Sequence, residues 1–119
     1  VAHNLSDLFS IPEKWAEMAR VYPDVPVVMY HMGVPWMSDS AIRLASEYDN
    51  IYLSTCAAFV PVMQKALQKI GASKIIFSSD APYGSMVQEI NKIKYVAQNT
   101  KDQELIFYKN ISNLLGLNY

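Results

Sequence analysis

The sequence predicts an α/β protein in which parallel strands alternate with helices. Three short apolar runs rich in β-branched side chains occupy residues 26–30, 51–54 and 74–77, as expected of parallel strands covered on both faces. Segments with apolar residues at helical spacing lie between these runs, and polar residues directly follow each run. This alternation indicates βαβ units with right-handed crossovers, which place the C-terminal ends of all strands on the same side.

Helices are expected over residues 10–22, 39–48, 62–70 and 86–98, followed by short helices over 100–103 and 111–115. Their starts carry capping residues, because Ser10, Ser85 and Thr100 each precede a Glu or Gln by three positions and Ser38 precedes the second helix. The first helix has an apolar stripe made of Trp15, Met18, Ala19 and Tyr22. Gly71 is a helix stop ahead of the third strand.

Length and composition limit the classes of protein to consider. With 119 residues, of which 51% are hydrophobic, the chain has the size of one domain or part of one. Its net charge of −1 provides no basic surface for nucleic acid or an anionic membrane, and no apolar run approaches the roughly 20 residues that span a bilayer. The single cysteine, Cys56, fits a reducing compartment, so we expect a cytoplasmic protein. Because Val1 is not an initiator methionine, we also expect a piece of a longer chain.

Two polar residues mark the ends of predicted strands. His31 follows the first strand, with Gly33 allowing a sharp turn, and Asp80 follows the third. Taken singly, the histidine could be hydrogen-bonded in its loop and the aspartate could form a turn or cap a helix. Because the strand ends share one side, the two side chains can also share a site. There the carboxylate could bind a metal ion or take a proton from metal-bound water.

Four further residues are candidates, each with a structural alternative. His3 could approach the same rim as a metal ligand or be a loop histidine. Cys56 could be a nucleophile with His31 as its base or a small buried side chain, and nothing around it resembles a nucleophile signature. Trp36 and Tyr83 follow the two strand-end residues and could line a substrate pocket or pack elsewhere. The absence of a Gly-rich phosphate motif argues against nucleotide binding.

The order of these features resembles the amidohydrolase superfamily, specifically the amidohydrolase-2 group that includes aminocarboxymuconate-semialdehyde decarboxylase. The resemblance spans most of the chain and depends on the order of four modest segments. They are Ala19–Val28 leading into His31-Met32-Gly33, then Ile51–Thr55, Lys74–Pro82 and the ending Tyr108–Leu117.

By this resemblance the chain is the C-terminal portion of a (β/α)8 TIM barrel, with residues 1–119 as a single partial domain of the last three to four βα units. His31 matches the histidine after the sixth strand, and Asp80 matches the aspartate after the eighth, which binds metal or assists proton transfer. His3 lies close to the position of the fifth-strand histidine, although Asn4-Leu5 departs from the small residue and glycine that usually follow it. The family's His-x-His pair, which follows the first strand of the complete barrel, lies outside this chain.

The resemblance also implies a cofactor and a chemistry. The cofactor is a divalent metal ion, often zinc, which lowers the pKa of bound water to near ~7 and polarises a substrate carbonyl. Asp80 would take the proton of that water. In related decarboxylases the same site adds or removes a proton on the substrate carbon. Hydrolysis and non-oxidative decarboxylation of a small carboxylated or amide substrate therefore both stay open.

A different class of protein is also consistent with the sequence, namely a non-catalytic α/β chain that binds a partner or assembles with itself. A partial barrel leaves open sheet edges and an uncovered apolar face, which favour pairing with the missing N-terminal half or with another copy of the chain. Whether the chain is an enzyme by itself stays open at this point.

Overall fold

The sheet of the protein is parallel, as the sequence predicts. The computed structural model describes residues 11–33 and 35–117. Its three strands are β1 (Val27–Met29), β2 (Ile51–Ser54) and β3 (Ile75–Ile76), in the spatial order β1-β2-β3. Leu53 in the central strand pairs with Met29 on one side and with Ile75 on the other. The C-terminal ends of the three strands therefore lie at the same edge of the sheet.

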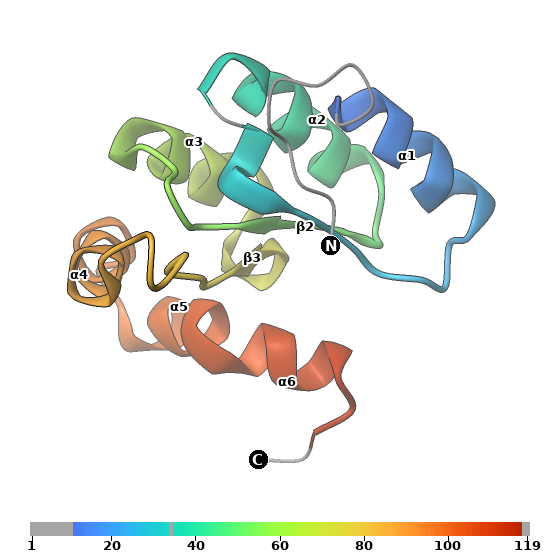
Figure 1. Cartoon of the computed structure of the whole chain (residues 1–119). Coiled ribbons are helices and arrows are strands. Elements are labelled where there is room, and N and C mark those ends of the chain that lie inside the picture. Colours follow the sequence, from blue (N-terminus) through green and yellow to red (C-terminus); the bar gives the residue numbers. More distant parts are fainter. Residues whose placement is uncertain (1–10, 34, 118–119) are drawn as a thin grey trace.

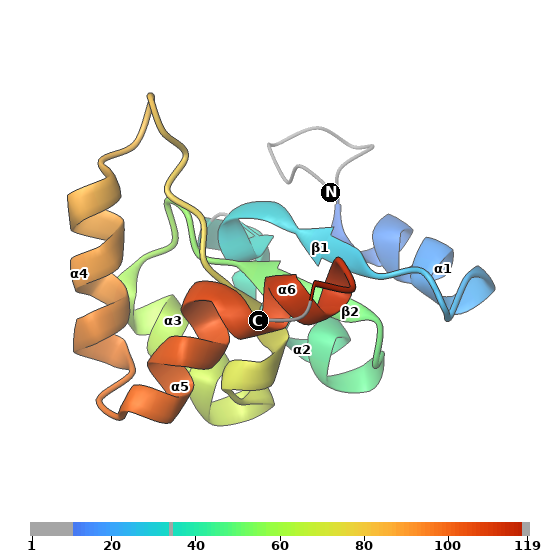
Figure 2. The same ribbon diagram turned by 90° about the horizontal axis from the view of Figure 1, so that it is seen from below.

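Helices connect the strands and complete the chain. They are α1 (Pro12–Val21), α2 (Ser38–Glu47), α3 (Val60–Ile70), α4 (Met86–Val96), α5 (Thr100–Glu104) and α6 (Asn110–Leu114). A π-helical segment, η4 (Leu105–Lys109), joins α5 to α6. Three short 3-10 turns complete the set, which are η1 (Tyr30–Gly33), η2 (Pro35–Met37) and η3 (Ala72–Lys74). In the two views, α1, α2 and α3 lie on one side of the sheet, and α5 and α6 lie on the other side of β3 (Figures 1 and 2). No helix within the described ranges has both the length and the hydropathy to span a membrane.

The core forms where the strands meet the connecting helices. Met29, Ile51 and Leu53 are fully buried, and α2 contributes the three inward-facing residues that its spacing predicts, which are Ile42, Leu44 and Ala45. The stripe predicted for α1 is only partly correct. Ala19 is buried and Trp15 packs against the core, but Met18 and Tyr22 are about half exposed, at 47% and 53%. The buried face of α1 instead contains Pro12 and Ala16, because the helix rests on small side chains.

The predicted helix boundaries hold in part. Ser85 is a cap, because its Oγ accepts a hydrogen bond from the backbone N–H three residues later at 3.4 Å, and Gly71 ends α3 with a φ of 73°. Two caps are wrong. Ser38 is the buried first residue of α2, and the cap of α5 is Asn99, whose Oδ1 accepts the backbone N–H three residues later at 2.8 Å. Ser10 lies outside the described residues.

The third strand is shorter than the predicted run over 74–77, because the closing helix replaces further strand pairing. The backbone N–H of Phe77 donates to the carbonyl oxygen of Ile106 at 2.9 Å. That carbonyl is accessible because η4 is π-helical, so the N–H of Asn110 reaches back to Leu105 instead of Ile106. The short helices predicted near the C-terminus are thus one continuous helical run over residues 100–114.

Asn110 strengthens the attachment of this helix to β3. Its side-chain amide donates to the carbonyl oxygens of Ala72 and Ile75, both at 2.7 Å, and the residue is 5% exposed. A buried amide with two backbone acceptors fixes position as well as contributing energy. The short strand β3 is therefore held from the helical side as well as by its neighbour β2.

Replacing Asn110 by leucine is expected to destabilise the fold. The change removes both amide donors and leaves two carbonyl oxygens near β3 without them, and a lost buried partner costs about 1–3 kcal/mol. We expect the free energy of unfolding, measured by urea denaturation with circular dichroism, to fall by about 2–4 kcal/mol. The matched control is Asn113→Leu on the exposed side of α6, which should change stability by less than about 0.5 kcal/mol. Equal losses in the two variants would contradict the role of Asn110.

Candidate functional site

His31 lies in a sharp turn directly after β1. The backbone φ angles of His31, Met32 and Gly33 are all positive, at 58°, 49° and 88°. Such angles are uncommon for residues other than glycine and are found preferentially at functional sites. A Cβ on Gly33 would stand only 3.0 Å from the Cβ of Ala41 and from the backbone nitrogen of Ser38. The structure thus confirms that Gly33 permits the turn, and the turn leaves His31 buried at 6% exposure.

The His31 imidazole contacts Cys56, the residue that follows β2 by two positions. Its Nδ1 atom is 3.0 Å from the carbonyl oxygen of Cys56 and 3.2 Å from its Sγ atom. A carbonyl oxygen can only accept a hydrogen bond, so this contact assigns the proton of the neutral ring to Nδ1. The lone pair is then on Nε2, the nitrogen that a metal ion or a proton would use.

Hydroxyl side chains connect the ends of β2 and β3. The Oγ atoms of Ser54 and Ser78 are hydrogen-bonded to each other, and the backbone N–H of Cys56 donates to Ser78 Oγ at 3.2 Å. Thr55 makes two contacts with Ser78, because its Oγ1 accepts from the Ser78 N–H at 3.0 Å and donates to the Ser78 carbonyl at 3.3 Å. Ser54, Thr55 and Cys56 are all at most 1% exposed. The strand ends are therefore joined by a polar network that is buried at residues 54–56 and partly buried at Ser78.

Tyr30 adds a phenol to this network. Its ring meets that of His31 edge-on, with centroids 4.6 Å apart and planes inclined by 75°. Burial raises the pKa of the Tyr30 hydroxyl, as do its hydrogen bond with Cys56 and the charges of Cys56 and Asp80, whereas a hydrogen bond with Ser78 lowers that pKa. Tyr30 is therefore a neutral hydrogen-bonding group at neutral pH.

Asp80 lies in the turn after β3 and is partly buried. Its φ is 57°, and its carbonyl oxygen accepts the N–H of Gly84 at 2.8 Å. Only glycine fits at position 84, since a Cβ there would collide with the carbonyl oxygen of Ser79. The charge of Asp80 acts on the Tyr30 phenol, which links this turn electrostatically to the end of β1.

The other residues singled out from the sequence differ in their placement. Trp36 and Tyr83 are exposed at 72% and 92%, so their proposed contact with a substrate stays a prediction. His3 lies outside the described residues. Across residues 11–33 and 35–117, no group of three His, Cys, Asp or Glu side chains could hold a metal ion. The structure brings His31 and Cys56 into contact but does not add Asp80 to them as a third ligand.

Sequence reasoning singles out Cys56 but misses four members of the network, which are Tyr30, Ser54, Thr55 and Ser78. The apolar run over residues 26–30 places Tyr30 in the first strand, but β1 ends at Met29 and Tyr30 begins the turn η1. A tyrosine next to a strand-end histidine was the available signal, as was a hydroxyl residue directly after the third apolar run. Neither pattern reveals that the side chains meet, because the contacts join residues more than 20 positions apart.

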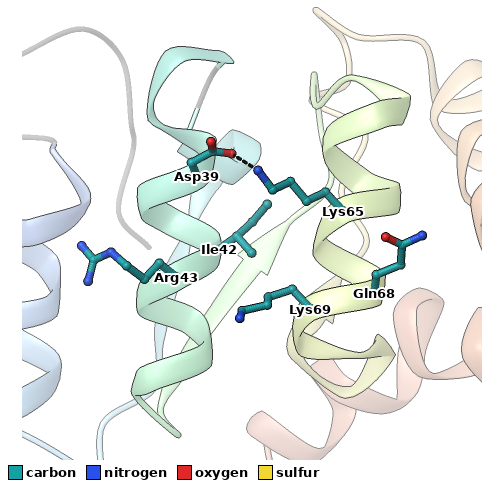
Figure 3. Close-up of a pocket in the computed structure, with 6 residues that line it drawn as sticks. All are labelled: Asp39, Ile42, Arg43, Lys65, Gln68 and Lys69. Carbon is teal, nitrogen blue, oxygen red and sulfur yellow. Dashed lines mark hydrogen bonds and ion pairs between the residues drawn. The ribbon is translucent and has the colours of Figure 1, made fainter.

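A pocket of about 350 Å³ lies between α2 and α3 and shares no residue with this network. It is lined by Asp39, Ile42, Arg43, Lys65, Gln68 and Lys69. Asp39 and Lys65 form an ion pair with an N–O distance of 2.7 Å, and Figure 3 marks this pair with a dashed line between α2 and α3. Arg43 is paired with Glu47 at 3.1 Å. Two of the cationic side chains that line the pocket, Arg43 and Lys65, form ion pairs with carboxylates at exposed positions. The pocket is therefore a feature of the helical surface, and the strand ends are the better candidate site.

Comparison with known proteins gives a family and a fold. The sequence matches the family model described as amidohydrolase over residues 9–117. Among curated protein sequences the chain has no significant match.

Three solved structures illustrate the likeness of fold. An uncharacterised TIM-barrel protein from Bordetella bronchiseptica has a TM-score of 0.77 at 21% identity, over 93% of this chain and 41% of its own. A zinc-bound amidohydrolase from Burkholderia multivorans has a TM-score of 0.74 at 13% identity, over 89% and 49%. A dihydroxybenzoic acid decarboxylase from Polaromonas sp. JS666, with bound manganese and the inhibitor 2-nitroresorcinol, has a TM-score of 0.68 at 20% identity, over 92% and 42%. The chain thus has the α/β fold of part of a TIM barrel and spans less than half the length of these three proteins.

Alkylation tests whether Cys56 is a nucleophile. It is the only cysteine, it is 0% exposed, and its Sγ faces the imidazole. We expect the folded chain to resist iodoacetamide and the chain in denaturant to react completely, as measured by mass spectrometry, because a buried thiol is shielded from the reagent. Rapid alkylation of the folded chain would instead support the thiol mechanism.

Proposed function

The chain belongs to the amidohydrolase family, and on this premise we propose that it is the C-terminal part of a metal-dependent hydrolase or decarboxylase. In this proposal, residues 1–119 supply the last three to four βα units and the rest of the barrel comes from outside this chain. The share of the solved TIM-barrel structures that the chain covers, between 41% and 49% for the three described above, supports it.

The orientation of the His31 ring carries the proposal. Its Nδ1–H is directed to the backbone carbonyl of Cys56, which leaves Nε2 as the coordinating atom. Metal-binding histidines characteristically donate their second ring N–H to a carbonyl or carboxylate in this way, which fixes the tautomer and the ring plane. Asp80 would contribute a carboxylate from the turn after β3. An imidazole nitrogen and a carboxylate oxygen both suit zinc or manganese.

Other groups must complete the metal centre, because the part of the chain that the structure describes contains no set of three ligands. We assign one position to His3 and the remaining ones to the missing strands of the barrel. A bound divalent ion would activate water and polarise a substrate carbonyl. His31 would hold that ion, and Asp80 would accept a proton from water or transfer one at the substrate carbon.

A small carboxylated or amide substrate suits this arrangement. The decarboxylase from Polaromonas is named for a dihydroxybenzoic acid, a small aromatic acid. Trp36 and Tyr83, exposed beside the turns of His31 and Asp80, would contact such a ring by stacking or edge packing. The only cysteine of the chain is a buried free thiol, which suits a reducing compartment such as the cytoplasm.

Self-association is a second candidate property. Within the described ranges β1 pairs with a strand on one side only, and an unpaired strand edge is a template for another strand. The missing N-terminal half of the barrel or a second copy of this chain would cover that edge. Size-exclusion chromatography of the chain discriminates these possibilities, since a stable monomer would argue against assembly between copies.

Manganese binding tests the assignment of His31 and Asp80. Mn²⁺ is paramagnetic and broadens the NMR signals of nearby nuclei, so it reports weak binding to an incomplete site. In the 15N-labelled chain, we expect titration with MnCl₂ to broaden the amide signals after β1 and β3 first. The substitutions His31→Gln and Asp80→Asn should each abolish this selective broadening.

The matched control is Asp24→Asn, which removes an exposed carboxylate from the opposite end of β1. It should leave the broadening unchanged. Uniform broadening, or broadening that survives His31→Gln, would refute the metal assignment. In the complete barrel, Asp80→Asn should lower turnover about 100-fold or more, the range expected for loss of a proton-transfer group.

A further inference from the structure

We propose that Ser78 is a positioning residue that couples the His31 imidazole to the Asp80 turn, with Cys56 as the connecting element. The inference deepens the proposed function and depends on it only in treating His31 and Asp80 as members of one site. Its evidence is a continuous series of hydrogen bonds across the three strand ends.

The first link joins β1 to β2. His31 Nδ1 lies 3.0 Å from the carbonyl oxygen of Cys56 and 3.2 Å from its Sγ. Both contacts come from one residue, so Cys56 contributes to fixing the position of the ring, against which Tyr30 also packs. Because Cys56 is 0% exposed, water does not compete for the imidazole N–H at this contact.

The second link joins β2 to β3. Cys56 lies beyond the end of β2, and its backbone N–H donates to Ser78 Oγ at 3.2 Å. That oxygen also bonds Ser54 Oγ, and the Tyr30 hydroxyl forms a hydrogen bond with the same serine. Ser78 therefore contacts residues of both other strand ends, and its Oγ is the acceptor for the backbone N–H of Cys56.

The third link runs along the backbone from Ser78 to Asp80, two residues later. Thr55 Oγ1 makes both contacts with the Ser78 backbone. It accepts from the Ser78 N–H at 3.0 Å and donates to the Ser78 carbonyl oxygen at 3.3 Å. The following turn closes through the 2.8 Å bond between Asp80 and Gly84. A shift of Ser78 thus moves the base of the Asp80 turn and the Cys56 carbonyl together.

A merely structural role for Ser78 would stabilise the sheet without affecting the imidazole. A positioning role predicts in addition that Ser78 determines which ring nitrogen of His31 carries the proton. An imidazole without a fixed partner populates both neutral tautomers, whereas one held on a carbonyl is restricted to the Nδ1–H form. The tautomer is therefore the readout that separates the two roles.

Long-range 1H–15N correlation NMR of the imidazole rings measures this tautomer in the 119-residue chain. His3 and His31 are the only histidines, so the His3→Gln background gives one signal set. The spectra are recorded at about pH 8.5, above the ordinary pKa range of histidine side chains. We expect the Nδ1–H tautomer in this background and also in Cys56→Ser, which keeps the carbonyl. Ser78→Ala should yield a mixture of both tautomers and shift the amide signals of residues 79–84.

The matched control is Ser73→Ala, the same substitution at an exposed position of η3, which should keep the parent tautomer. If Ser78→Ala does not fold, Ser78→Cys keeps a side chain of similar size with a weaker acceptor and should shift the tautomer in the same direction. A parent tautomer in these variants, or an Nε2–H ring in the background chain, overturns the inference. Because no metal or substrate is present, a parent tautomer in the variants leaves the proposed function to be decided by the manganese titration. An Nε2–H ring in the background chain would also count against the proposed function, since that proposal is carried by the Nδ1–H contact.

Discussion

The attachment of the closing helix to β3 is the constraint on which the candidate site depends. β3 contains only two residues, and its successor Phe77 donates its N–H to the carbonyl of Ile106 rather than to another strand. The π-helical turn releases that carbonyl, since it shifts the N–H of Asn110 to Leu105. Without this contact a backbone N–H next to the core would lose its partner, at a cost of about 1–3 kcal/mol. The helix thereby places Ser78 and the Asp80 turn at the sheet edge.

The strand ends combine strained backbone with a connected network of hydrogen bonds. His31, Met32 and Asp80 all have positive φ angles, which cost energy in residues other than glycine. The network of Ser54, Thr55, Cys56 and Ser78 offsets this cost, because its members are bonded to one another and all but the partly buried Ser78 are shielded from water. A rigid polar rim of this kind holds side chains in one geometry, which is a requirement of a metal or catalytic centre.

The proposed chemistry depends on the side chains at the strand ends and on further ligands from outside this chain. Hydrogen bonding to the Cys56 carbonyl prepares His31 to act through Nε2, and Asp80 adds a carboxylate on the same side of the sheet. In the proposed function these two groups are ligands of a metal centre, while the described residues include no three-ligand set. The chain belongs to the amidohydrolase family and spans less than half the length of the compared TIM barrels, and both facts support the proposal that further ligands come from outside it.

The sequence by itself determined the alternation of strands and helices, the inward face of α2 and the positions of His31 and Asp80 after their strands, because apolar periodicity and turn residues are local properties. Tertiary structure decided the partners of those residues. Met18 and Tyr22 stay exposed because small side chains form the contact surface of α1, and β3 is short because a helix carbonyl replaces a strand partner. Likewise, the contacts of His31 with Cys56 and of Cys56 with Ser78 join distant positions of the chain. Local patterns carry no record of such contacts, since only the packed sheet brings the three strand ends together.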